Sequence, residues 1–271
     1  MDSDDILKGR ILSRREILGL FGAAGAAFLV ACSGDDDSSP ATSGGNSSGA
    51  VAEGTPAVSG GSAGVSAAAT ATSVPSCVVL PDLTEGPYFV DTQLDRSDIR
   101  SDPTSGVMRE GAELTLTLNV LSVGGGSCAP MSGAMVDIWQ CDAVGVYSGV
   151  QDNAQGFNTM NQKFLRGFQM SGADGQVKFT TVYPGWYPGR ATHIHFKIRK
   201  GNEEFTSQFV FDDTLSNEIN NNLAPYSRRG ANGRTQNATD SIYRQSNGIL
   251  LLDVQKSGNA YAATFDIGIQ A

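Results

Sequence analysis

The chain is short of basic charge and of long apolar runs, and each shortage weighs against a class of protein. Its 19 lysine and arginine residues are outnumbered by 28 aspartate and glutamate residues, giving a net charge of −9. This balance disfavours nucleic-acid binding, which depends on neutralising phosphates. The uncharged apolar run near the N-terminus covers only residues 17–31. That run is too short to span a bilayer comfortably.

The first residues nevertheless resemble an export signal. Residues 13–16 read Ser-Arg-Arg-Glu, a twin-arginine pattern, and the apolar run that follows ends in Leu-Val-Ala-Cys at Cys32. This ending resembles the lipobox of bacterial lipoproteins, which implies cleavage before Cys32 and lipid attachment to its sulfur. We therefore expect residues 1–31 to be a twin-arginine lipoprotein signal peptide. The mature protein would be exported and lipid-anchored to the bacterial cell envelope, on its periplasmic or cell-surface side. The alternative is a plain secretory signal followed by an incidental cysteine.

Aromatic residues are absent from residues 33–76, which are nearly all Ser, Gly, Ala, Thr, Asp, Pro and Val. Such a composition cannot bury a core. We therefore predict that residues 32–76 form a lipidated, flexible linker. Residues 77–271 are long enough for a single domain with a sizeable core.

Cysteine is also scarce, because only Cys77, Cys128 and Cys141 follow Cys32. In an oxidising compartment, two of these three thiols are expected to pair. We favour a disulfide between Cys128 and Cys141, which would close a short loop. Three pairings are open, and the sequence does not choose among them.

Strand patterns dominate the domain, and helical periodicity is scarce. Apolar and polar residues alternate or cluster in segments bounded by turn residues, which is typical of β-strands. Glycine-rich turns at 124–126 and 174–175 separate these segments. The pattern predicts an all-β fold, a single β-sandwich, with one short helix near 237–244. The expected strands cover residues 114–120, 134–140, 177–182, 193–199, 205–211, 249–254 and 261–269.

The only two histidines of the chain are His193 and His195, and they lie on the same predicted strand. Because side chains alternate along a strand, both imidazoles would point to one face, with Ile194 and Phe196 on the other. Tyrosines precede them in a turn rich in proline and glycine. Imidazole nitrogens and phenolate oxygens together suit a trivalent metal such as ferric iron. The alternative is that the two histidines belong to the polar face of a surface strand.

Four segments, in order, resemble the intradiol ring-cleavage dioxygenases, in particular a secreted single-domain branch related to protocatechuate 3,4-dioxygenase and catechol 1,2-dioxygenase. They are residues 84–88 (Thr-Glu-Gly-Pro-Tyr), 136–148, 164–167 (Phe-Leu-Arg-Gly) and 179–196. The resemblance extends over residues 77–271 and implies a β-sandwich of that type. It also implies a non-haem Fe(III) cofactor whose ligands would be Tyr147, Tyr187, His193 and His195.

The same resemblance implies roles for further residues. The catalytic residues would be Tyr187, Arg190 and Gln208, and the substrate pocket would be lined by Gly86, Pro87, Tyr88 and Arg190. Tyr183 competes with Tyr187 for the ligand position, but the spacing of the matching motif places the ligand at Tyr187 and leaves Tyr183 as a packing residue. Arg166 would either support the site or brace a loop.

The activity that the resemblance implies is cleavage of catechol-type rings between the two hydroxylated carbons by O2, giving cis,cis-muconate-type diacids. Catecholic substrate and O2 would be the partners, with no nucleic acid and with membrane contact only through the N-terminal lipid. The helical dimerisation segment of the catechol enzymes is replaced by the linker, so the oligomeric state is left open, a homodimer included.

Two other functions are compatible with the sequence. One is a non-catalytic envelope lipoprotein that binds a metal or another ligand with the same β-sandwich. The other is an extradiol Fe(II) enzyme, which needs a carboxylate beside its two histidines. The sequence places no such carboxylate next to their strand.

Overall fold

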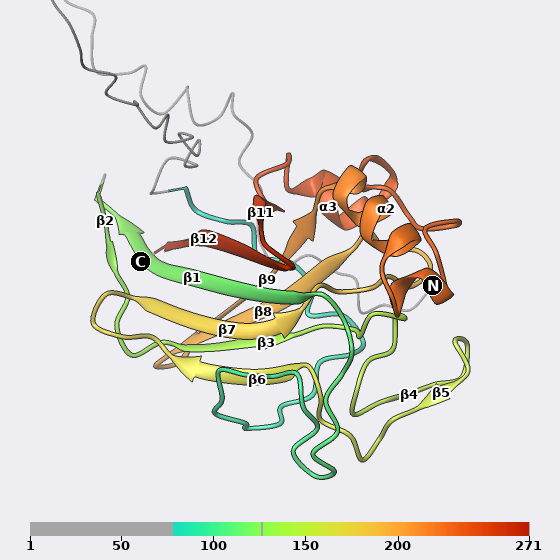
Figure 1. Ribbon diagram of the computed structural model, residues 1–271. Coiled ribbons are helices and arrows are strands. Elements are labelled where there is room, and N and C mark those ends of the chain that lie inside the picture. Colours follow the sequence, from blue (N-terminus) through green and yellow to red (C-terminus); the bar gives the residue numbers. More distant parts are fainter. Residues whose placement is uncertain (1–77, 126, 271) are drawn as a thin grey trace, which may run out of the picture. The chain divides into compact units, whose positions relative to one another are not determined.

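The protein's structure is a computed structural model that describes residues 78–125 and 127–270 (Figure 1). The expected signal peptide, the lipidated Cys32 and the linker lie outside these residues and stay predictions. Within the described residues, no helix is long and apolar enough to cross a bilayer.

Twelve strands and a few short helices make up the described residues. The strands are β1 (Glu113–Gly124), β2 (Ser127–Pro130), β3 (Met135–Trp139), β4 (Gln151–Asp152), β5 (Phe157–Asn158), β6 (Arg166–Met170), β7 (Gln176–Val182), β8 (His193–Lys200), β9 (Glu203–Phe211), β10 (Leu251–Leu252), β11 (Val254–Ser257) and β12 (Ala260–Gln270). The helices are α2 (Asp213–Asn222) and α3 (Ser241–Gln245), with 3-10 turns η1 (Tyr226–Arg228) and η2 (Asn237–Thr239).

Two five-stranded sheets carry the fold, which confirms the predicted β-sandwich. One sheet has the order β11-β12-β1-β2, with β7 also paired to β1, and the other has the order β10-β9-β8-β3-β6. Strands β4 and β5 form a separate two-stranded hairpin. In Figure 1 this hairpin and helices α2 and α3 lie at one end of the sheets, and β2 lies at the other.

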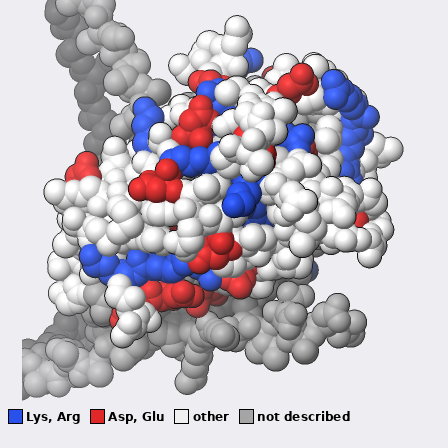
Figure 2. Space-filling view, turned by 90° about the horizontal axis from the view of Figure 1, so that it is seen from below, with Lys and Arg blue, Asp and Glu red and all other residues white. Residues whose placement is uncertain are grey.

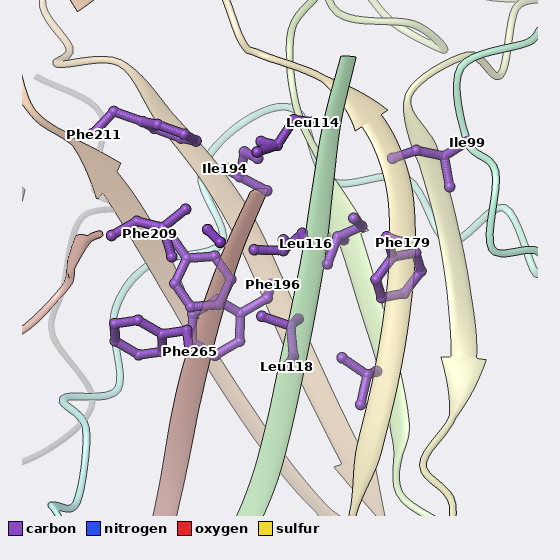
Figure 3. Close-up of a cluster of buried hydrophobic side chains, with 14 of the residues drawn as sticks. Ile99, Leu114, Leu116, Leu118, Phe179, Ile194, Phe196, Phe209, Phe211 and Phe265 are labelled. Carbon is purple, nitrogen blue, oxygen red and sulfur yellow. The ribbon is translucent and has the colours of Figure 1, made fainter. Parts of the chain in front are cut away.

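The core fills the space between the two sheets. Leu114, Leu116 and Leu118 alternate along β1 and are fully buried. Figure 3 shows them facing Ile194 and Phe196 from β8 of the second sheet. Period-2 alternation of apolar residues therefore places one face of each sheet in a shared core, as the sequence predicts.

The outer face of the second sheet is also buried, because residues 81–91 cross it. We call these residues the covering segment. Leu83 N donates to Thr206 O at 2.7 Å, and Gln208 Nε2 donates to Thr84 O at 3.2 Å. Lys197 Nζ lies 2.5 Å from a carboxylate oxygen of Glu85. The alternation predicted for β8 is confirmed, but its polar face lies beneath the covering segment rather than on the surface.

The predicted Cys128–Cys141 disulfide is wrong. Cys141 is a free thiol that is only 2% exposed, whereas Cys128 is disulfide-bonded. The two residues belong to different parts of the sandwich: Cys128 lies on the edge strand β2 of the first sheet, and Cys141 follows β3 of the second. Short separation in sequence does not bring them together.

The helix expected near 237–244 is present as η2 and α3. Helix α2 was not expected, although its start carries a recognisable signal. The side chain of Asp212 caps the helix by accepting from Leu215 N at 2.9 Å, as an N-cap aspartate does.

Basic and acidic side chains lie next to one another over much of the face that Figure 2 shows. Among the ion pairs of the described residues, Arg100 pairs with Asp98 at 2.7 Å and with Glu113 at 2.6 Å. The face in Figure 2 therefore presents both signs of charge rather than a field of one sign.

Candidate metal centre

Four side chains, three from residues 187–195 and one from Tyr147, bring nitrogen and oxygen atoms into one buried cluster. His193 Nε2 lies 3.0 Å from His195 Nε2, 3.4 Å from the hydroxyl of Tyr147 and 3.3 Å from the hydroxyl of Tyr187. None of the four residues is more than 8% exposed. The structure thus brings together the four residues that the sequence analysis names as metal ligands. We call them the four-donor cluster.

The two histidines take their places from strand β8. Residues two apart on a strand share a face, and this face of β8 points away from the core, toward the covering segment. The cross-strand partners of His195 are Trp139 on β3 and Gln208 on β9. The Trp139 ring stacks on the His195 ring with centroids 4.9 Å apart. Packing of this kind holds the imidazole in one orientation.

The two tyrosines lie on loops that approach each other closely at glycine positions. Gly185 lies in the turn before Tyr187, and a Cβ there would lie 2.6 Å from the carbonyl oxygens of Asp142 and Ala143. Gly145 lies in the loop before Tyr147, has a φ of +90°, and a Cβ there would lie 2.3 Å from Trp186 O. Both positions therefore need a residue without a side chain.

Hydrogen bonding and burial set the protonation of the histidines. His193 Nδ1 donates to the carbonyl of Ala191 at 2.6 Å, which leaves the Nε2 lone pair facing the other donors. Burial, with a contribution from Arg190, lowers the pKa of His193. Burial and the neighbouring His193 lower the pKa of His195 well below its usual value. Both imidazoles are therefore neutral, the form that binds a metal.

The tyrosines are strongly held in their protonated form when no cation is present. Burial raises the pKa of Tyr187 to about 12 and raises that of Tyr147 well above its usual value. A phenolate at this place therefore needs a strong Lewis acid beside it.

The cluster fits a ferric ion. Nitrogen and oxygen ligands about 2 Å from one first-row metal ion lie roughly 3 Å from each other, and the observed separations are 3.0–3.4 Å. Two neutral imidazoles and two phenols form a mixed set of harder oxygen and borderline nitrogen donors, which suits a trivalent metal. No group of three or more His, Cys, Asp or Glu side chains that could hold a metal occurs among the described residues. Those residues therefore do not form the two-histidine, one-carboxylate set of the extradiol alternative.

Arg190 and Gln208 meet beside the cluster. Arg190 donates to Gln208 Oε1 at 2.5 Å and to Asp240 Oδ2 at 2.9 Å. Asp240 also accepts from Ala191 N at 2.7 Å, and its other oxygen caps helix α3. Burial alone would raise the pKa of Asp240, but Arg190 and the backbone N–H groups lower it overall. The predicted contact between Arg190 and Gln208 is present, and Asp240 is a buried partner that the sequence analysis missed.

The covering segment reaches the cluster through Gly86 and Tyr88. A Cβ on Gly86, whose φ is +70°, would lie 3.4 Å from Cε1 of His195. The Tyr88 ring stacks on Tyr147 with centroids 4.5 Å apart and meets the Tyr187 ring edge-on at 5.6 Å. Pro87 between them is exposed. Gly86 and Tyr88 therefore border the four-donor cluster, whereas no contact between Pro87 and the cluster is seen among the described residues.

Arg166 is a buried cation without a carboxylate partner among the described residues. Its guanidinium donates to Ser148 O at 2.6 Å and to Ser148 Oγ at 3.0 Å, and Nη1 has no partner. Its Cζ lies 5.9 Å from the centroid of the Tyr147 ring. Arg166 therefore holds the backbone of Ser148, the residue that follows Tyr147.

Tyr183 lies away from the cluster. Its hydroxyl is 2.8 Å from Ser216 Oγ of helix α2, and its ring packs against Phe211 with centroids 4.6 Å apart. The residue is completely buried in the core. Of the two tyrosines in the turn, the structure thus brings Tyr187 to the histidines.

Comparison with known proteins gives one consistent family. A sequence profile described as Dioxygenase matches residues 84–230. The solved structure of an intradiol ring-cleavage dioxygenase from Tetranychus urticae is 31% identical, with a TM-score of 0.63, over 72% of this chain and 95% of that one. The chlorocatechol 1,2-dioxygenase of Pseudomonas putida is 28% identical over 30% of this chain. The protocatechuate 3,4-dioxygenase beta chain of Burkholderia cepacia is 32% identical over 32% of this chain. The matches span only 36% and 39% of the length of these two curated relatives.

Proposed function

The chain belongs to the intradiol ring-cleavage dioxygenases, and from this premise we propose that it is a non-haem Fe(III)-dependent enzyme. It would use O2 to cleave catechol-type rings between the two hydroxylated carbons, giving cis,cis-muconate-type diacids. The observation that carries the proposal is the convergence of Tyr147, Tyr187, His193 and His195 in one buried cluster. When bound, ferric iron would supply a Lewis acid that binds the catechol oxygens and favours the phenolate form of the tyrosines.

The two tyrosines would have different tasks. Tyr147 is fully buried beneath Tyr88, whereas Tyr187 retains 8% exposure. Tyr187 is therefore better placed to accept a proton from the hydroxyl of an incoming catechol. Proton acceptance by a positioned side chain is general-base catalysis.

Arg190 would stabilise negative charge on the ring. Asp240 and Gln208 hold its guanidinium in a fixed position, and Arg190 acts on Tyr187 by lowering its pKa against the effect of burial. A preorganised, permanently charged donor at this place stabilises charge that develops during the reaction. The stacked rings of Trp139 and Tyr88 and the covering segment would exclude water from the histidine and tyrosine donors.

The visible spectrum of the iron-loaded protein tests the proposal. Tyrosinate bound to ferric iron gives a broad charge-transfer band, and we expect this band to shift to longer wavelength when catechol is added without oxygen. Tyr147→Phe and Tyr187→Phe should each weaken the band, whereas Tyr183→Phe, which loses only a contact to Ser216, should keep it. A folded, iron-supplied protein without colour would reject the assigned site.

A non-catalytic metal-binding protein is the alternative. It gives no reason for a guanidinium held by both Asp240 and Gln208 next to the cluster. An assay of catechol ring cleavage, monitored by oxygen uptake, distinguishes the two functions. An iron-loaded, coloured protein that consumes no oxygen with any catechol would favour the alternative.

We further propose, from residues 1–76 alone, that the enzyme is exported and lipid-anchored through Cys32. Cys32→Ser should leave the protein in the soluble fraction of the cell envelope, and mass spectrometry of the wild-type N-terminus should detect a lipidated cysteine. An unmodified Cys32 in the exported protein would contradict the anchor.

A further inference from the structure

A carboxylate lies near the four-donor cluster, on the β4–β5 hairpin. Asp152 Oδ2 accepts from the hydroxyl of Tyr88 at 2.5 Å. Gln155 Nε2 donates to both the Tyr88 hydroxyl and Asp152 Oδ2, each at 2.9 Å. Since the Tyr88 ring stacks on Tyr147 at 4.5 Å, Asp152 is separated from a cluster residue by one side chain.

Asp152 carries an uncompensated negative charge. The hydrogen bond from Tyr88 is the main cause that lowers the pKa of Asp152, so the carboxylate is ionised at neutral pH. Within the described part of the chain, no lysine, arginine or histidine nitrogen lies within ion-pair distance of it.

Among the described residues, neither of the two arginines beside the cluster is both unpaired and accessible. Arg190 forms an ion pair with Asp240 at 2.9 Å. Arg166 is only 2% exposed and donates to Ser148. A ring substituent that carried a carboxylate would therefore approach Asp152 without finding an unpaired, accessible guanidinium among these residues.

Resting on the proposed function, we propose that Asp152 is a specificity-determining residue that favours catechols with uncharged ring substituents over carboxylated catechols. Repulsion between like charges at a partly solvated site can change affinity by roughly three- to tenfold. Repulsion of an unwanted ligand is a common source of specificity. Tyr88 positions the carboxylate, and its hydroxyl is already committed as a donor to Asp152.

The test compares two probes that differ in charge but little in shape, 3,4-dihydroxybenzoate and 3,4-dihydroxybenzamide. Their dissociation constants for the iron-loaded full chain are measured without oxygen from the spectral shift, and kcat/KM is then measured with oxygen. We expect the wild type to prefer the amide and Asp152→Asn to reduce that preference three- to tenfold. High salt should reduce the preference of the wild type and leave that of the variant unchanged, because salt screens exposed charges.

Asp174→Asn is the matched control, since it removes the same charge from the exposed turn between β6 and β7, which Figure 1 shows at the end of the sheets opposite to the β4–β5 hairpin. Its preference should equal that of the wild type. Tyr88→Phe keeps the aromatic ring but releases the carboxylate, so it should reduce the preference less than Asp152→Asn does.

An unchanged preference in Asp152→Asn, or an equal change in Asp174→Asn, would overturn the inference while leaving the proposed function intact. If the iron-loaded wild type bound neither probe nor catechol itself, the proposed function would fail, and the inference would fall with it.

Discussion

The two faces of strand β8 are both buried, yet by different kinds of contact. On the inner face, Ile194 and Phe196 are fully buried among aliphatic and aromatic side chains of both sheets. On the outer face, His193, His195 and Lys197 are 1–7% exposed and contact polar or charged groups, among them Glu85 of the covering segment at Lys197. Alternate residues of one strand thus belong to the core and to the functional site.

The difference shows that burial alone does not tell whether a residue contributes to the stability of the fold or to the functional site. The inner face is held by the hydrophobic effect and close packing, which depend on buried area and volume. The outer face is held by directional contacts, whose net contribution to stability is small because folding exchanges them for contacts with water. We therefore expect substitutions on the inner face to change mainly stability and those on the outer face to change mainly the site.

Phe196→Ala should have the largest effect on stability. The Phe196 ring stacks on Phe209 with centroids 4.3 Å apart and is completely buried. Removing it leaves a cavity, and we expect the free energy of unfolding to fall by about 3–5 kcal/mol. Urea unfolding of the apo-protein measures this, with Phe196→Leu as a control that should lose less than Phe196→Ala because it leaves a smaller cavity. A loss below about 1 kcal/mol for Phe196→Ala would contradict the role of the inner face.

Gly185→Ala should have the next largest effect, and it should also damage the site. A Cβ 2.6 Å from two backbone oxygens must push apart the loops that carry Tyr147 and Tyr187. We expect a loss of about 2 kcal/mol in the free energy of unfolding together with weaker iron binding, measured as iron content per folded protein. Gly106→Ala is the control, because no atom lies within 4 Å of its Cβ and only its φ of +72° opposes the change. The control should lose about 1 kcal/mol and keep its iron.

Lys197→Met should affect stability less, although Lys197 is the direct neighbour of Phe196. Its Nζ pairs with Glu85 at 2.5 Å and lies 4.3 Å from the centroid of the Phe89 ring. The methionine keeps most of the buried stem, and Glu85, whose side chain is 45% exposed, returns to water. We expect a loss of about 1 kcal/mol, measured by urea unfolding. A loss as large as that of Phe196→Ala would show that the two faces do not differ in the way we argue.

The sequence was sufficient to predict the sandwich and both faces of β8, because strand periodicity depends on local alternation. It could not predict what covers the outer face. The contacts of Thr84 with Gln208 and of Glu85 with Lys197 join residues more than a hundred positions apart, and no local pattern records such pairs. The same limit explains the wrong disulfide prediction, since no local pattern shows that Cys128 lies on β2 while Cys141 follows β3 of the other sheet.

The four-donor cluster was predicted from a resemblance between motifs, not from periodicity. Periodicity alone would have left His193 and His195 as candidates on a polar face, without Tyr147. Asp240 escaped prediction because a Thr-Asp-Ser sequence indicates only a helix N-cap. Its second role, as the partner of Arg190, depends on a contact across 50 positions.

Asp91→Asn should have the smallest effect, and its pH dependence tests the directional character of the outer face. The hydrogen bond from Arg199 is the main cause that lowers the pKa of Asp91, whose side chain is 41% exposed. Asp91 therefore stabilises the fold above its unfolded pKa of about 4, and this contribution is lost as the pH falls through the lower folded value. At pH 7 and low salt, we expect the variant to lose about 0.5 kcal/mol, with the difference vanishing once the pH is below the lowered pKa of Asp91. Asp137, the other partner of Arg199, is the matched comparison, because burial raises its pKa despite Arg199. As the pH rises through the raised pKa of Asp137, the wild type should therefore lose stability relative to Asp137→Asn. For each variant, the difference in unfolding free energy from the wild type can be plotted against pH, and the two plots should slope in opposite directions. Parallel curves in urea unfolding would show that the two carboxylates are not distinguished by burial.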